Sequence, residues 1–158
     1  MSKSKGVYLF IFTIPFETEV EIGKLGRYSF LPGRYVYVGS GMGGVSARVR
    51  RHLCGCQSKR WHIDYLIENA VDKKAVIYLT DSREMECILS SLVRDIPGAE
   101  NPVRGFGSSD CSCYSHIYLI PETSYHELLN IDLKNCCKSE VLTCRTIDQY
   151  EMAGLENH

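Results

Sequence analysis

The first third of the chain consists of short apolar runs separated by turn residues. Residues 7–14 are aromatic and β-branched, which is typical of a largely buried strand, and Pro15 closes the run. Residues 17–22 alternate acidic and apolar side chains, as an edge strand with one solvated face does. After a link rich in glycine, residues 34–38 predict another strand, with Tyr37 on one of its two faces.

Helical periodicity follows this strand. Residues 45–53 place three apolar side chains on a narrow stripe, and Arg48 and His52, four residues apart, lie along one edge of it. Both side chains can therefore face one site. The pattern also predicts helices at residues 61–70, 82–95 (with Ser82 as N-cap) and 124–130, and strands at residues 74–80 and 116–120.

These elements predict a single α/β domain, or more narrowly an α+β domain, with a small and mainly antiparallel central sheet flanked by helices. The sequence contains no internal repeat, low-complexity tract or domain-breaking linker, so residues 1–158 are interpreted as one unit. Its core is expected at about residues 6–120, with residues 121–158 as a C-terminal extension. Residues 150–158 are expected to fray.

Composition narrows the class of protein. A chain of 158 residues can bury a core without disulfides or a structural metal. No apolar run approaches the roughly 20 residues that cross a bilayer, so no membrane partner is expected. The first run contains Thr13 and Pro15 and precedes no cleavage site, which argues against a signal peptide. We therefore expect the eight cysteines to be reduced thiols in the cytoplasm.

The net charge of −1 gives no overall field that would attract nucleic acid. The local distribution is different, because five basic residues occur within thirteen positions that contain no acid: Arg48, Arg50, Arg51, Lys59 and Arg60. Such a cluster is either a solvated helix face or a basic patch that contacts phosphates.

Three short motifs resemble the signature of the GIY-YIG nuclease superfamily. They are Gly6-Val7-Tyr8 on the first strand, Tyr37-Val38-Gly39 on a later strand, and Arg48 with His52 on the following helix. Residues 33–40, 51–52, 61–66, 86–87 and 105–113, with His116, resemble a branch of that superfamily, a domain of unknown function sometimes fused to endonuclease III. The resemblance covers about residues 6–120. Because the interval between the two motif tyrosines is long, it implies an extra strand inserted there.

The resemblance implies an active site of Tyr8, Tyr37, Arg48 and Glu86, and His52 is added as a proton shuttle or phosphate ligand. Hydrolysis of a phosphodiester needs an oxygen nucleophile and neutralisation of the developing charge. The Glu86 carboxylate suits Mg²⁺ or Mn²⁺, the Arg48 fork suits non-bridging oxygens, and a tyrosine pair can position or deprotonate water. The expected function is metal-dependent cleavage of DNA or RNA.

Each residue also has a structural explanation. The tyrosines can be core residues, Arg48 a solvated base, and Glu86 the partner of Arg83 or Arg94. The helical asparagine of the superfamily has no counterpart in residues 90–95. A module that binds nucleic acid without cutting it is therefore the alternative function.

Further residues are assigned to the edges of the site. The expected nucleic-acid contacts are Ser40, Arg50, Arg51, Lys59, Arg60 and Trp61, with Trp61 either a core anchor or a base-stacking platform. The expected border of the site is His62, Asp64, Asp110 and His116. Zinc ligands could come from Cys54, Cys56, Cys111, Cys113, His62 and His116, but a C-x-C pair is closer than the usual spacing, which favours Mg²⁺ over zinc.

Overall fold

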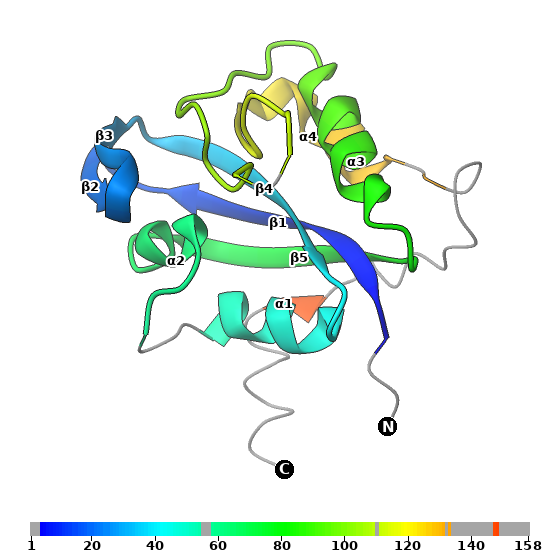
Figure 1. The fold of residues 1–158 in the computed structure, drawn as a ribbon. Helices are drawn as coiled ribbons and strands as arrows, with labels where there is room; N and C mark the ends of the chain where they lie inside the picture. Colours follow the sequence, from blue (N-terminus) through cyan, green and yellow to red (C-terminus); the bar gives the residue numbers. More distant parts are fainter. Residues whose placement is uncertain (1–3, 55–57, 110, 132, 134–146, 149–158) are drawn as a thin grey trace.

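The strand β1 (Gly6–Ile14) lies at the centre of a five-stranded antiparallel sheet in the computed structural model, which describes residues 4–54, 58–109, 111–131, 133 and 147–148 (Figure 1). The strand order is β6 (Ile117–Ile120), β4 (Gly33–Gly41), β1, β5 (Val71–Leu79) and the two-residue β7 (Ile147–Asp148). β1 pairs with β4 along its whole length, which sets Tyr8 opposite Gly39.

Both faces of the sheet are buried, because β1 is apolar at nearly every position. Tyr8, Phe10 and Phe12 face one core, which α1 (Val45–Cys54) and α2 (His62–Ile67) cover. Val7, Leu9 and Ile11 face the other core, which α3 (Glu84–Arg94) and α4 (Tyr125–Leu129) cover. The α+β fold with a mainly antiparallel sheet between helices, expected from the sequence, is confirmed.

The interval between β1 and β4 holds two strands and not the single strand expected from the sequence. β2 (Thr18–Ile22) and β3 (Gly26–Phe30) pair with each other in a separate small sheet, joined by the 3₁₀ helix η1 (Gly23–Leu25). Glycines at both ends of η1 concealed β3 within an apparent link. Arg27 stabilises the pair through Glu19, whose carboxylate accepts a hydrogen bond at 2.8 Å.

The other predicted elements are present with shifted ends, and the 3₁₀ turn η2 (Glu122–Ser124) precedes α4. Ser82 is not the N-cap of α3 as expected; Arg83 holds that position, and the Ser82 amide donates to the Thr80 hydroxyl at 3.1 Å. The fraying expected at residues 150–158 lies outside the described residues. Among the described helices, none has both the length and the apolar character needed to cross a membrane.

Candidate active site

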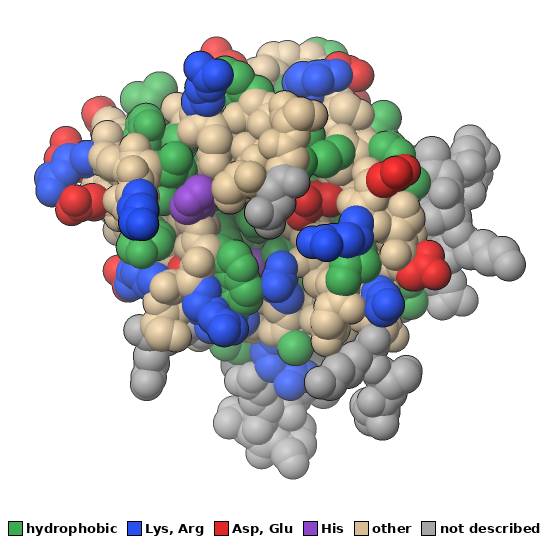
Figure 2. Space-filling view, viewed as in Figure 1, with side chains coloured by type: hydrophobic (Ala, Val, Ile, Leu, Met, Phe, Trp, Pro, Cys, Tyr) green, Lys and Arg blue, Asp and Glu red, His purple; other side chains and the backbone are tan. Residues whose placement is uncertain are grey.

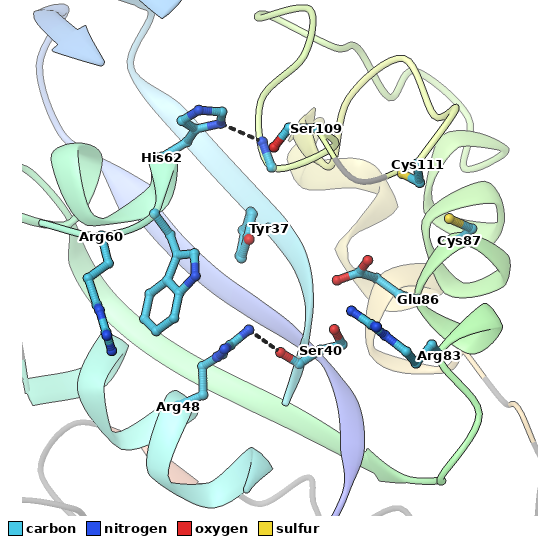
Figure 3. A pocket seen from close by; sticks show the side chains of 12 residues that line it. Tyr37, Ser40, Arg48, Arg60, His62, Arg83, Glu86, Cys87, Ser109 and Cys111 are labelled. Carbon is cyan, nitrogen blue, oxygen red and sulfur yellow. Dashed lines mark hydrogen bonds between the residues drawn. The ribbon is translucent and has the colours of Figure 1, made fainter. Parts of the chain in front are cut away.

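A cavity of about 630 Å³ opens beside β4. The pairing of β4 with β6 runs from Arg34 to Tyr37, and the cavity lies next to the part of β4 that continues to Ser40. Helices from both faces of the sheet therefore reach it around this edge (Figure 3). The described residues that line it are Tyr37, Ser40, Arg48, Arg60, Trp61, His62, Arg83, Glu86, Cys87, Gly107, Ser109 and Cys111.

One side of the cavity, here called the arginine wall, consists of Arg48, Arg60 and Trp61. The Arg48 guanidinium lies 4.2 Å from the centre of the Trp61 ring and donates to the Ser40 carbonyl at 2.6 Å. The guanidinium groups of Arg60 and Arg51 also lie within 5.7 and 4.9 Å of that ring centre. Cation–π contacts thus hold the guanidinium groups in defined positions. Trp61 packs against the core, and its ring contacts the arginines. It is therefore not an open platform on which a base could stack.

The arginine wall continues into a second hollow of about 300 Å³, which Arg48, Arg60 and Trp61 also line. Arg51 joins them there, together with the glycines of the turn between β4 and α1. In the space-filling view, basic side chains gather over α1 and α2 along one side of the hollowed region (Figure 2). Because the two hollows share Arg48, Arg60 and Trp61, they are here called together the basic track.

Asp64 supports the arginine wall through hydrogen bonds to residues 51, 60 and 61. Its carboxylate is fully buried and accepts hydrogen bonds from Arg51 at 2.9 Å and from the backbone of Arg60 and Trp61 at 2.8 and 3.0 Å. Burial alone would raise the pKa of Asp64, but these hydrogen bonds outweigh it and lower the pKa. The expectation that Asp64 borders the site is therefore replaced by a supporting role, since it caps the start of α2.

The opposite side is here called the carboxylate wall. It consists of the N-cap residue Arg83, of Glu86 and Cys87 from α3, and of Cys111 from the loop after it. Figure 3 shows the Glu86 carboxylate directed into the cavity, facing Arg48 across it. A Glu86 oxygen also lies 3.9 Å from Nδ1 of the buried His116. Arg94, one of the partners expected for Glu86, instead contacts Asp95 at 3.5 Å.

Tyr8 and His52 form a buried layer behind the cavity. The Tyr8 hydroxyl and His52 Nε2 are hydrogen-bonded at 2.6 Å, and both side chains are at most 1% exposed. The His52 ring lies edge-on to Tyr37, with 6.0 Å between ring centres. Gly39 permits this packing, because a Cβ there would lie 2.4 Å from the Tyr8 hydroxyl. The pair therefore supports Tyr37 and does not itself face the cavity.

The protonation states of this layer follow from burial. Burial raises the pKa of Tyr8 and of Tyr37 well above the ordinary value of 10.0. Burial also lowers the pKa of His52 from 6.5 to about 4. At neutral pH the two tyrosines are hydroxyl groups and His52 is a neutral imidazole. A tyrosinate that deprotonates water, one of the roles expected from the sequence, does not fit this resting state.

His62 borders the cavity and fixes the loop beside it. The Gly107 amide donates to His62 Nδ1 at 2.8 Å, and Figure 3 shows this bond. Gly107 has a φ of +69°, and a Cβ on it would lie 2.7 Å from the Tyr37 ring. A glycine at this position therefore lets the loop backbone pack directly on Tyr37.

Two of the predicted nucleic-acid contacts lie away from the cavity. Arg50 is exposed on α1, and Lys59 is ion-paired with Glu68, so neither is assigned to the cavity. Asp110 and Cys56 lie outside the described residues. Sequence reasoning missed Arg83, Cys87, Gly107 and Ser109 as lining residues. Arg83 could have been found, because it stands one helical turn before Glu86.

The fold and site define an α+β protein with a basic cavity that Tyr37 and one described carboxylate line, and with Tyr8 buried behind it. The chain belongs to the family described as "Domain of unknown function DUF123", whose sequence pattern matches residues 7–138. Searches of the curated proteins and of the solved structures found no match to it.

Proposed function

We propose that this protein is a metal-dependent endonuclease of the GIY-YIG type that hydrolyses phosphodiester bonds in DNA or RNA. The observation that carries the proposal is the cavity that Tyr37, Arg48 and Glu86 share, although they come from three separate elements. Three arginines and one glutamate are the charged side chains among its described lining residues. Such a balance suits a phosphodiester, whose charge grows in the transition state.

Arg48 is the residue we expect to contact the non-bridging oxygens. Its guanidinium is positioned in advance by the Ser40 carbonyl and the Trp61 ring, so little ordering is needed when substrate binds. A planar fork of donors also matches the geometry of a phosphate better than an ammonium does. Arg60 and the second hollow would hold the flanking backbone phosphates, which orient a strand without reading its sequence.

Tyr37 is the tyrosine we expect to contact the substrate or the attacking water. Because its pKa is raised by burial, it acts as a hydroxyl group that donates or accepts a hydrogen bond. Tyr8 and His52 are positioning residues in this proposal, because they hold the Tyr37 ring from behind. Their hydrogen bond gives this support a fixed geometry.

Glu86 fits the divalent ion that such an enzyme requires. Its carboxylate reaches the cavity, and Mg²⁺ is commonly held by one or two carboxylates together with waters and substrate phosphate oxygens. When bound, Mg²⁺ or Mn²⁺ would polarise a phosphoryl oxygen and acidify water. The proposal includes a cytoplasmic location, which the free thiols of Cys87, Cys111 and Cys113 support.

The second candidate is a module that binds nucleic acid without cleaving it. Trp61 and the basic track favour binding regardless of chemistry, because cation–π contacts fix three guanidinium groups near the same surface. In this case Glu86 would serve the fold and not a metal ion.

The test is nicking of supercoiled plasmid, with a labelled RNA in parallel, in Mg²⁺ and in Mn²⁺. We expect wild type to cut, and Arg48→Ala and Glu86→Gln to lose on the order of 10³-fold in rate. Arg50→Ala and Glu84→Gln are the matched controls, since each removes the same kind of charge from an exposed position on the same helix.

The outcomes separate the two candidates. Cleavage that survives in Glu86→Gln would exclude the assigned site. If wild type binds a labelled duplex with an Arg48-dependent affinity and cuts neither nucleic acid, the non-cleaving module is the correct function. If wild type neither binds nor cuts, both candidates fail.

A further inference from the structure

Two residues of the carboxylate wall, Cys87 and Cys111, belong to a cluster of sulfur and nitrogen ligands that the proposed cleavage reaction does not use. Cys87 comes from α3, Cys111 and Cys113 from the following loop, and His116 from the residue before β6. Their ligand atoms all lie within 4.8 Å of one another. The three cysteines are free thiols, and Figure 3 shows Cys87 and Cys111 on facing segments.

The spacing of these atoms suits a tetrahedral zinc ion. With Zn–S of about 2.3 Å and Zn–N of about 2.0 Å, a sulfur and a nitrogen ligand are separated by roughly 3.5 Å. The Cys111 sulfur lies 3.6 Å from His116 Nε2. Three thiolates and one imidazole are also a ligand set that zinc prefers to the oxygen-seeking Mg²⁺.

His116 supplies the nitrogen atom of this cluster. Its side chain is completely buried, and Nε2 is the ring nitrogen near the Cys111 sulfur. Among the described residues no hydrogen-bond partner is found for Nδ1, so a metal ion on Nε2 would leave Nδ1 able to donate to a carboxylate.

We propose that Cys87, Cys111, Cys113 and His116 bind one structural zinc ion. Four protein ligands close a tetrahedral site, which is the arrangement of structural rather than catalytic zinc. The C-x-C pair that argued against zinc in the sequence supplies only two of the ligands. Cys87 completes the set from α3, and His116 Nε2 provides the single nitrogen.

The ion would join α3 to the loop that forms part of the cavity. That loop, between Asp95 and His116, contains no helix or strand among its described residues. Long loops without secondary structure need other means of holding one conformation. Because Cys87 adjoins Glu86 and Cys111 lines the cavity, zinc would fix the position of the carboxylate wall.

Glu86 would also act on the zinc site. Its carboxylate oxygen is 3.9 Å from His116 Nδ1, the nitrogen on the opposite side of the ring from the sulfurs. Histidines that bind zinc commonly donate their second ring N–H to a carboxylate, which fixes the tautomer and the ring orientation. A small approach of Glu86 would make this bond.

The test is metal analysis of the full chain, purified in a metal-free reductant and dialysed without chelator. We expect about one zinc per chain in wild type and less than about one tenth in Cys87→Ser and Cys113→Ser. Cys54→Ser is the matched control, because it changes an exposed thiol on α1 and should retain the ion.

A second measurement does not depend on variants that fold. After zinc is removed, wild type should bind Co²⁺ with the visible absorption of a tetrahedral site and with sulfur-to-cobalt charge-transfer bands. Octahedral cobalt spectra would overturn the proposal. Three other results would also overturn it. They are wild type that contains no zinc, a Cys113→Ser protein that retains zinc, and a disulfide between any two of the three cysteines, found by peptide mapping. Metal content does not depend on cleavage, so this proposal and the nuclease proposal fail separately.

Discussion

The two walls of the cavity are built in opposite ways. The arginine wall comes from α1 and the residues just before α2. It is held by contacts between residues near one another in the sequence: Arg48 with Trp61, and the backbone of Arg60 and Trp61 with Asp64. The carboxylate wall combines α3 with a loop far along the chain. Its members, including Glu86 and Cys111, come together only because the fold brings their distant segments side by side.

The difference has a chemical counterpart. The arginine wall offers hydrogen-bond donors that are fixed before any ligand arrives, which suits a surface that binds phosphates. The carboxylate wall offers one carboxylate and a group of thiols, which are the ligands of cations. In the proposed function, the arginine wall therefore binds the phosphodiester and the carboxylate wall binds the divalent ion.

Asp64 tests how strongly the arginine wall depends on its local supports. Asp64→Asn would remove the buried carboxylate that accepts hydrogen bonds from Arg51 and from the backbone of Arg60 and Trp61, at a cost of about 3 kcal/mol in the free energy of unfolding. Urea unfolding monitored by Trp61 fluorescence measures this. The control is Asp72→Asn, an exposed carboxylate on β5. Equal stability of the two variants would mean that the Asp64 network does not stabilise this wall.

Glu86→Asp tests whether the carboxylate wall depends on position as well as charge. Withdrawing the carboxylate by one methylene should reduce Mg²⁺-dependent nicking roughly 100-fold, equivalent to about 2.7 kcal/mol. Arg48→Lys, which keeps the charge on the arginine wall and loses the fork, should cost closer to 10-fold. A larger loss for Arg48→Lys than for Glu86→Asp would reverse the proposed ranking of the two walls.

His52, in the buried layer behind the cavity, makes the free energy of unfolding depend on pH. Because burial lowers its pKa from 6.5 to about 4, the unfolded chain binds the proton more readily than the folded protein. The stability from this group is complete above pH 6.5 and is lost as pH falls toward 4. We expect it to contribute about 2 kcal/mol less at about pH 5 than at about pH 7.5.

The measurement compares urea unfolding of wild type and His52→Gln at the two pH values. The difference between the proteins separates His52 from other titrating groups such as His116. If His52→Gln loses as much stability on acidification as wild type does, burial does not hold His52 neutral in the folded protein.

Lys59 and Arg60 test where the arginine wall ends. Lys59 is ion-paired with Glu68, and exposed pairs of this kind contribute little, so Lys59→Ala should change stability by less than about 0.5 kcal/mol. It should also leave the salt dependence of duplex binding unchanged. Arg60→Ala should reduce the slope of log K against log salt by about one, because Arg60 lines both hollows. Equal slopes in the two variants would show that the hollows do not hold the phosphates.

Much of the fold could be predicted from the sequence, because local periodicity determines strands and helices. The run that became β1 and the stripe that became α1 are examples. β3 was missed because glycines set its boundaries, and its partner β2 lies outside the central sheet. Ser82 is not the N-cap because α3 begins one residue later than the pattern indicated, at Glu84, so that Arg83 holds the N-cap position.

For the site, the sequence alone determined which chemical groups were available, since a tyrosine, an arginine and a glutamate have the same donors and acceptors in any fold. It also determined that Arg48 and His52 share a helix edge, because that depends on spacing alone. Only the tertiary structure decided that Arg48 faces the cavity while His52 lies behind it with Tyr8. Likewise, only the tertiary structure brought Cys87 to Cys111, Cys113 and His116, because contacts between distant segments depend on strand pairing and burial, and local sequence does not encode them.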